Sequence, residues 1–174
     1  VDPKRSDSSY PEQVLCGTGV AFQLVRALFA SRDLGLEAGA EKRGLLDLVG
    51  LATISDMVPL TGENRVLARW GLYALRRSRR PGLTMLLRTL RVRQQYLTED
   101  DVSFMIAPRI NAASRMGKPD DAFLLLTTTD EAEAGAAVEH HNHINDERKG
   151  AVAAMVREIK GRIKKDGRLD ERPV

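Results

Sequence analysis

The chain has 174 residues, of which 43% are hydrophobic and 29% are charged, so it can bury a core and fits one domain or a piece of a larger one. It contains no run of 18 uncharged apolar residues and no secretion signal at its start, so we expect no membrane segment and a cytoplasmic location. A single cysteine excludes a disulfide framework and a cysteine-based zinc site, and a net charge of +3 is too mildly basic to indicate nucleic-acid binding by itself.

The first third of the chain predicts a loop, a helix and a second loop. Residues 1–12 have loop composition, and apolar residues recur at helical spacing over residues 14–29. Gly17 and Gly19 suggest a phosphate-binding loop, but close packing explains them better because the lysine and hydroxyl residue of such a loop are missing. Residues 31–43 carry glycines and charges and predict the second loop.

The stretch from Asp47 to Arg65 organises the chain, because its apolar part delivers one carboxylate, Asp56, at its end. Residues 45–54 have no polar face and predict a buried helix or a buried strand; their length favours the helix. Pro59 disfavours helix in the residue before it and so helps to end the element. A carboxylate at this position must be paired, cap the backbone or bind a metal, and position alone favours a cap.

A second helix is predicted for residues 65–80, with Asn64 as its cap. One face of it is expected to be cationic, with Arg65, Arg69, Arg76 and Arg80, and the opposite face to pack, with Val66, Leu67, Trp70, Tyr73 and Ala74. The region from residue 64 to 98 contains no acid, and we call its arginines the arginine-rich stretch: Arg65, Arg69, Arg76, Arg77, Arg79, Arg80, Arg88, Arg91 and Arg93.

Two interpretations of the arginine-rich stretch remain equally open. It is either a solvated surface balanced by acids elsewhere, or a surface that contacts phosphates, which guanidinium groups match with two hydrogen bonds. Trp70, Tyr73 and Tyr96 could stack on bases, but aromatic residues at helical spacing are more often part of a core. We therefore favour the core interpretation for them.

A polar segment follows a predicted helix start. Thr98 precedes three acids, which is typical of a helix N-terminus. The chain then leads into the sequence APRINAASRMG at residues 107–117. Arg109, Asn111 and Arg115 of this segment are equally suited to hold a phosphate or to tie a loop to carbonyl oxygens.

The last part of the chain predicts a short helix from Pro119 and then one long helix capped by Asp130. No proline interrupts residues 130–165, which at helical rise would form a rod of about 50 Å. His140, His141 and His143 resemble a metal cluster, but no cysteine and no fixed third ligand accompanies them. A solvated polar face is the favoured interpretation.

Three segments resemble one family of nucleases. CGTGVAFQL at residues 16–24, ATISDMVPLTGENR at residues 52–65 and PRINAASR at residues 108–115 are similar to segments of the RecJ family, the single-strand-specific 5′ exonucleases of the DHH phosphoesterase superfamily. The long helix, with Asn145, Glu147 and Arg148, resembles the helix that joins the DHH domain to the following DHHA1 domain in that family. Ser114 stands where the family usually has glycine.

The resemblance implies that Asp56 ligates one of two catalytic Mn²⁺ or Mg²⁺ ions, and that Arg109, Asn111 and Arg115 hold the backbone of single-stranded DNA. It also implies a mainly α-helical fold in three parts: the C-terminal part of an α/β DHH domain at 1–80, a helical connector at 81–129, and a long interdomain helix at 130–174. The family's Asp-x-Asp and Asp-His-His motifs, expected upstream of Val1, and its glycine- and histidine-bearing DHHA1 motif, expected downstream of Val174, have no match in this sequence.

We therefore expect an internal fragment of a metal-dependent exonuclease of DNA repair and recombination, inactive by itself; the missing initiator methionine agrees with a fragment. Apolar faces that a fragment leaves uncovered would favour self-association. Two other hypotheses remain open. One is a non-catalytic helical module that binds single-stranded nucleic acid through the arginine-rich stretch. The other is an interaction domain whose long helix pairs with a partner, although no sustained heptad supports it.

Overall fold

The structure is a computed structural model that describes residues 2–32 and 40–165. Its α-helices are α1 (Gly17–Ser31), α2 (Ala40–Ser55), α3 (Gly62–Leu75), α4 (Pro81–Thr89), α5 (Ala107–Arg115), α6 (Pro119–Thr127) and α7 (Glu131–Lys165), with short helical turns η1 (Gln94–Tyr96) and η2 (Asp101–Ile106). These residues contain no β-strand, so the mainly α-helical class is confirmed and the strand alternative for residues 45–56 is wrong. None of the helices described is both long and apolar enough to cross a membrane.

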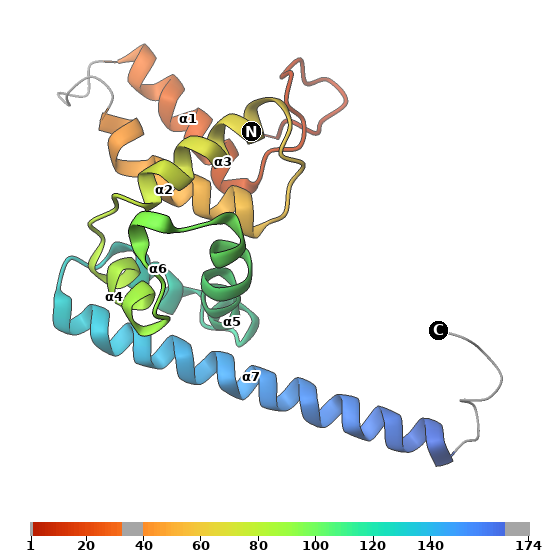
Figure 1. Cartoon of the computed structure of the whole chain (residues 1–174). Helices are drawn as coiled ribbons and strands as arrows, with labels where there is room; N and C mark the ends of the chain where they lie inside the picture. Colours follow the sequence, from red (N-terminus) through yellow and green to blue (C-terminus); the bar gives the residue numbers. More distant parts are fainter. Residues whose placement is uncertain (1, 33–39, 166–174) are drawn as a thin grey trace.

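The helices form two packed groups that share α2 and α3 (Figure 1). A small core of Leu15, Phe22, Val49 and Leu67 joins α1, α2 and α3. A larger core joins α2 and α3 to the helices that follow; its fully buried members include Leu75, Leu86, Val102, Ile106 and Leu125. The apolar run 45–54 therefore serves both cores, which explains why it has no polar face.

Two glycines let α2 and α3 cross in backbone contact. A Cβ atom added to Gly50 would lie 2.4 Å from the Cα of Gly71, and one added to Gly71 would lie 2.2 Å from the Cα of Gly50. No side chain fits there, so both positions require glycine for packing. This contact turns one stripe of α3 toward the core: Asn64, Leu67, Ala68, Gly71 and Leu75.

The predicted faces of the helix after residue 64 are therefore partly wrong. Leu67 is buried as expected, but Val66, Trp70 and Tyr73 are about half exposed, because the glycine contact orients a neighbouring stripe toward α2. Tyr96, in η1, is also exposed, so the core interpretation of these aromatic residues is wrong.

The prediction that Asn64 caps this helix is also wrong. Thr61 occupies the N-cap position of α3, and Asn64 lies inside the helix, fully buried, where its Nδ2 donates a hydrogen bond to the carbonyl oxygen of Val14 at 2.8 Å. Helix α3 also ends at Leu75 and not at residue 80.

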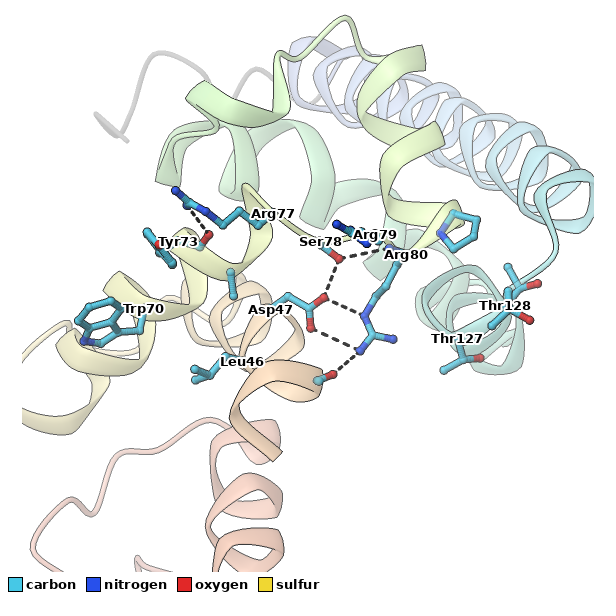
Figure 2. Close-up of a pocket in the computed structure, with 14 residues that line it drawn as sticks. Leu46, Asp47, Trp70, Tyr73, Arg77, Ser78, Arg79, Arg80, Thr127 and Thr128 are labelled. Carbon is cyan, nitrogen blue, oxygen red and sulfur yellow. Dashed lines mark hydrogen bonds and ion pairs between the residues drawn. The ribbon is translucent and has the colours of Figure 1, made fainter. Parts of the chain in front are cut away.

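Two arginines of the arginine-rich stretch have structural roles. Arg80 donates to the buried carboxylate of Asp47, with its Nε 2.9 Å from Oδ2 (Figure 2). It also donates to the carbonyl oxygens of Gly44 and Leu126. Ser78 donates to the same carboxylate at 2.7 Å. Arg76 donates from Nε to the carbonyl oxygen of Leu97 at 2.8 Å. These contacts tie α2, the start of α4 and the end of α6 together, so the predicted cationic face is not continuous.

The N-terminal elements differ from the prediction at their ends. The first helix begins at Gly17, with Cys16 as its N-cap, and not near residue 14. Residues 1–12 are irregular as expected over their described part. Helix α2 begins at Ala40, so the loop predicted for residues 31–43 is wrong over its last residues, while residues 33–39 lie outside the described part.

The later helix starts agree with the sequence. Thr98 and Asp101 exchange hydrogen bonds across the turn before η2, as a helix start requires. Asp130 accepts from the backbone N–H of Glu133 at 2.8 Å, so it caps α7 as predicted. Helix α7 has 35 residues, which makes it roughly 50 Å long, and its N-terminal half packs against α4, α5 and α6 (Figure 1).

Candidate metal and nucleic-acid site

Asp56 follows the last residue of α2 and is exposed. Its backbone N–H still bonds to the carbonyl oxygen of Ala52 at 2.9 Å, and Met57 then leaves the helix with a φ of 54°. Within residues 2–32 and 40–165, the Asp56 carboxylate accepts no hydrogen bond, so the structure does not support the cap that position alone favoured.

Two features of this turn are locally unfavourable. A left-handed φ at a residue other than glycine, here Met57, costs of order 1 kcal/mol. A carboxylate just past a helix C-terminus, here Asp56, faces the negative end of the helix dipole. A cation bound to Asp56 would relieve the second cost. Unfavourable local features of this kind concentrate at functional sites.

The segment PRINAASR forms most of α5, with Pro108 in its first turn. Asn111 and Arg115 are four residues apart and share one face of the helix. Both line a cavity of about 220 Å³, together with Ser55, Ser103, Ala107, Pro108 and Arg148. Since Ser55 directly precedes Asp56, the fold brings two of the predicted substrate residues to the end of α2 that carries the predicted metal ligand.

Arg109 points elsewhere. Its Nε donates to Oδ1 of Asn142 at 2.7 Å, and one terminal nitrogen donates to the carbonyl oxygen of Met105 at 2.7 Å. The first of these bonds joins α5 to α7. A substrate contact by Arg109 stays a prediction. Ser114, which replaces the usual glycine, lies inside α5 without a positive φ and adds no backbone strain.

Helix α7 brings two further polar side chains to this region. Asn145 is fully buried, and neither its Oδ1 nor its Nδ2 has a hydrogen-bond partner in the described part of the chain. The buried Nε of Arg148, three residues later, also lacks one, and Arg148 lines the cavity. A buried polar group without a partner costs about 1–3 kcal/mol, so this arrangement favours an additional polar ligand or water.

Sequence reasoning assigned Asn145 and Arg148 only to a long linking helix. Their spacing of three indicates that both lie on one face of the helix. Val138, His141 and Ile144, which are buried, lie on the same face, so the spacing could have predicted that Asn145 and Arg148 face the interior.

The cavity is electropositive. Arg115 and Arg148 both line it, and no aspartate or glutamate is among its lining residues in the described chain. Ser55, Ser103 and Asn111 add side chains that can donate hydrogen bonds to oxygen atoms. Guanidinium groups match phosphate oxygens with two hydrogen bonds, and neutral donors add further ones, so this lining suits a phosphate.

The described residues do not complete a metal site. They contain no group of three or more histidine, cysteine, aspartate or glutamate side chains that could hold an ion. Mg²⁺ and Mn²⁺ prefer several oxygen ligands in near-octahedral geometry, and Asp56 would supply one of them. The residues present therefore fit one ligand of a shared site but not the whole site.

The three neighbouring histidines do not converge. His140 contacts Asp121 at 2.8 Å and His143 contacts Glu147 at 3.3 Å. His141 is fully buried and its Nδ1 bonds to the carbonyl oxygen of Ala137 at 2.8 Å, so a solvated face is wrong for His141. Burial lowers the pKa of His141 below its usual 6.5.

No family model matches the chain. The single-stranded-DNA-specific exonuclease RecJ of Bacillus subtilis (strain 168) is 37% identical over 171 residues, which cover 98% of this chain and 20% of the relative. A crystal structure of exonuclease RecJ bound to manganese matches with a TM-score of 0.77 and 37% identity, over 91% of this chain and 38% of that one. A structure of Thermus thermophilus RecJ with Mg²⁺ matches with a TM-score of 0.74 and 38% identity, over 86% of this chain and 23% of that one.

The likeness in sequence thus extends over nearly the whole chain, and the likeness in fold over most of it. The chain spans about a fifth of the length of the curated B. subtilis relative. On both grounds, the chain belongs to the RecJ family, in which it corresponds to a helical segment of longer proteins.

Proposed function

We propose that this chain is a segment of a metal-dependent exonuclease that digests single-stranded DNA from the 5′ end, in DNA repair and recombination in the cytoplasm. One observation carries the proposal: the exposed carboxylate of Asp56 adjoins Ser55, which lines the electropositive cavity together with Asn111, Arg115 and Arg148. Hydrolysis of a phosphodiester by this chemistry requires cationic groups around its oxygens and metal-binding acids beside it. The arginines supply the cationic groups, and Asp56 supplies one of the acids.

In this proposal the residues around the cavity have separate roles. Arg115 and Arg148 hold the oxygens of one phosphodiester, and Asn111 donates a further hydrogen bond to them. Asp56 would contribute an oxygen ligand to one of two Mn²⁺ or Mg²⁺ ions; when bound, such ions would supply activated water and charge neutralisation. Arg109 keeps α5 in place against α7 through Asn142. Because the described residues offer one ligand, we expect the 174-residue chain to bind DNA without cleaving it.

The first test is a gel series with 5′-labelled single-stranded DNA and the 174-residue chain, with and without Mn²⁺. We expect retarded DNA and no digestion. Arg115→Ala and Arg148→Ala should each weaken binding and reduce the salt slope, d log K/d log[salt], by about 0.7 because each removes one phosphate contact. Arg88→Ala removes an exposed arginine that does not line the cavity and is the matched control. Mn²⁺-dependent digestion that Asp56→Asn abolishes would refute the expectation of an incomplete site.

The second test uses the full-length protein that carries this segment. Asp56→Asn should abolish metal-dependent digestion while single-stranded DNA binding persists, because the substitution removes a ligand and leaves the arginines unchanged. Full activity in Asp56→Asn would overturn the metal role of Asp56. Unchanged DNA affinity in Arg115→Ala combined with Arg148→Ala would overturn the role of the cavity.

A second candidate function is a module that binds single-stranded nucleic acid through the arginine-rich stretch without catalysis. Several of its arginines are exposed: Arg65, Arg69, Arg77, Arg79, Arg88, Arg91 and Arg93. A steep fall of affinity with salt in the Arg115→Ala, Arg148→Ala double variant would favour this function.

Self-association is a further proposal. Helix α7 exposes Val152, Met155, Val156 and Ile159 on its C-terminal half, at helical spacing. We expect this apolar face to raise the apparent mass of the chain with concentration in analytical ultracentrifugation. Val156→Glu with Ile159→Glu should abolish the effect.

A further inference from the structure

A second concave surface, which we call the aromatic groove, has a volume of about 640 Å³. The N-terminal half of α2, the C-terminal end of α3, the start of α4 and the turn after α6 form it (Figure 2). Asp47 lies in its wall nine residues before Asp56, which places the two carboxylates about 14 Å apart along the axis of α2. The groove is therefore separate from the cavity beside Asp56.

Two exposed aromatic rings form one wall of the groove. Trp70 is 51% exposed and Tyr73 is 48% exposed, and their rings meet edge to face with centroids 5.7 Å apart. The guanidinium carbon of Arg77 lies 3.7 Å from the centre of the Tyr73 ring, within the range of a cation–π contact. This contact holds the Arg77 guanidinium over Tyr73, whose ring in turn meets that of Trp70 (Figure 2).

The charge of the groove is positive. The acid among its lining residues, Asp47, already accepts hydrogen bonds from Arg80 and Ser78. Arg77 and Arg79 also line the groove, and both are exposed. A complementary ligand therefore combines negative charge with a flat apolar part that can cover Trp70.

We propose that the aromatic groove binds single-stranded nucleic acid, with one unpaired base stacked on Trp70 and neighbouring phosphates held by Arg77 and Arg79. An unpaired base presents a free aromatic face and each nucleotide adds one negative charge, whereas the bases of a duplex are stacked on each other. The inference rests on the proposed function for the nature of the ligand, and it adds a contact remote from Asp56.

The chain contains one tryptophan, so intrinsic fluorescence reports on the groove without a label. Titration in EDTA with an oligothymidine short enough to occupy the groove alone should quench Trp70. The affinity measured from this quenching should fall with a salt slope of about −1.4, because two arginines of the groove contact phosphates. The same titrations of Arg77→Ala and Arg79→Ala should show a slope of about −0.7 each. In anisotropy with labelled oligothymidine, Trp70→Ala should weaken binding by about tenfold, a loss in the range of one base stack. Arg88→Ala, outside the groove, should behave as the parent chain.

Three results would overturn the inference. The first is quenching by duplex DNA that equals the quenching by oligothymidine. The second is displacement of the oligonucleotide by polyglutamate at equal charge concentration, which would indicate an acidic protein partner. The third is DNA binding without any change in the emission of Trp70. Asp56→Asn should leave the quenching in EDTA unchanged, because the proposed role of Asp56 requires a metal ion. If Asp56→Asn leaves digestion by the full-length protein intact while oligothymidine still quenches Trp70, the proposed metal role is refuted and the groove is not. If oligothymidine does not quench Trp70 while the full-length protein digests DNA normally, the groove is refuted and the metal role is not.

Discussion

Replacing Gly50 by alanine tests the helix crossing that carries Asp56. The added Cβ would lie 2.4 Å from the Cα and 2.6 Å from the carbonyl carbon of Gly71, whereas non-bonded carbon atoms prefer about 3.5–4.0 Å. Both obstructing atoms are backbone, so no side chain can rotate away, and α2 and α3 must separate by about 1 Å. Overpacking of this kind costs about 3 kcal/mol at the upper end of its range, and alanine returns up to about 1 kcal/mol of helix propensity.

The net effect should be a loss of about 2 kcal/mol in the free energy of unfolding, or a midpoint temperature about 4–8 °C lower. Thermal unfolding followed by circular dichroism measures it. Gly44→Ala is the matched control, since Gly44 lies in the same helix and a Cβ there would meet nothing within 4 Å. We expect it to stabilise the chain by up to about 1 kcal/mol. Equal effects of the two substitutions would refute the backbone-contact argument.

Three further predictions concern buried polar contacts. Asp47→Asn should lower the free energy of unfolding by about 3 kcal/mol in urea titrations, because it leaves the Arg80 guanidinium partly buried without its anion; a change below about 0.5 kcal/mol would contradict this. Arg109→Ala should cost about 1–2 kcal/mol by leaving Oδ1 of Asn142 without its donor, and an additive double variant with Asn142→Ala would contradict the contact. The lowered pKa of His141 means that the unfolded chain binds more protons, so stability should fall as pH decreases below about 6.5, and His141→Leu should flatten that dependence.

Local signals predicted most of the helices. The absence of proline after Asp130 and the cap at its N-terminus sufficed for α7, because capping and helical periodicity act within a few residues. The length of the apolar run favoured a helix ending near Asp56, and α2 ends at Ser55. The same local reasoning failed for Asn64, whose amide is used by the carbonyl oxygen of Val14, fifty residues away in the sequence.

The face of α3 depended on a contact that no local pattern contains. Trp70 and Tyr73 have the spacing of core residues, yet Gly71 must face Gly50, and that requirement leaves the two aromatic rings exposed in the groove. In the same way, the sequence of the arginine-rich stretch does not show which of its arginines pair with other residues of the chain. Arg80 is a structural residue because tertiary packing brings Asp47 to it, while Arg77 and Arg79 remain at the surface.

The sequence by itself determined the helical class, through composition and periodicity, and the family resemblance, through short motifs. The candidates Asp56, Asn111 and Arg115 are what that resemblance implies. Only the tertiary structure decided which candidates meet. It set Asn111 and Arg115 beside the residue before Asp56, added Arg148 from α7 and directed Arg109 toward Asn142. The physical reason is that side chains far apart in the sequence share a cavity only when the glycine crossing and the buried core fix the relative positions of their helices.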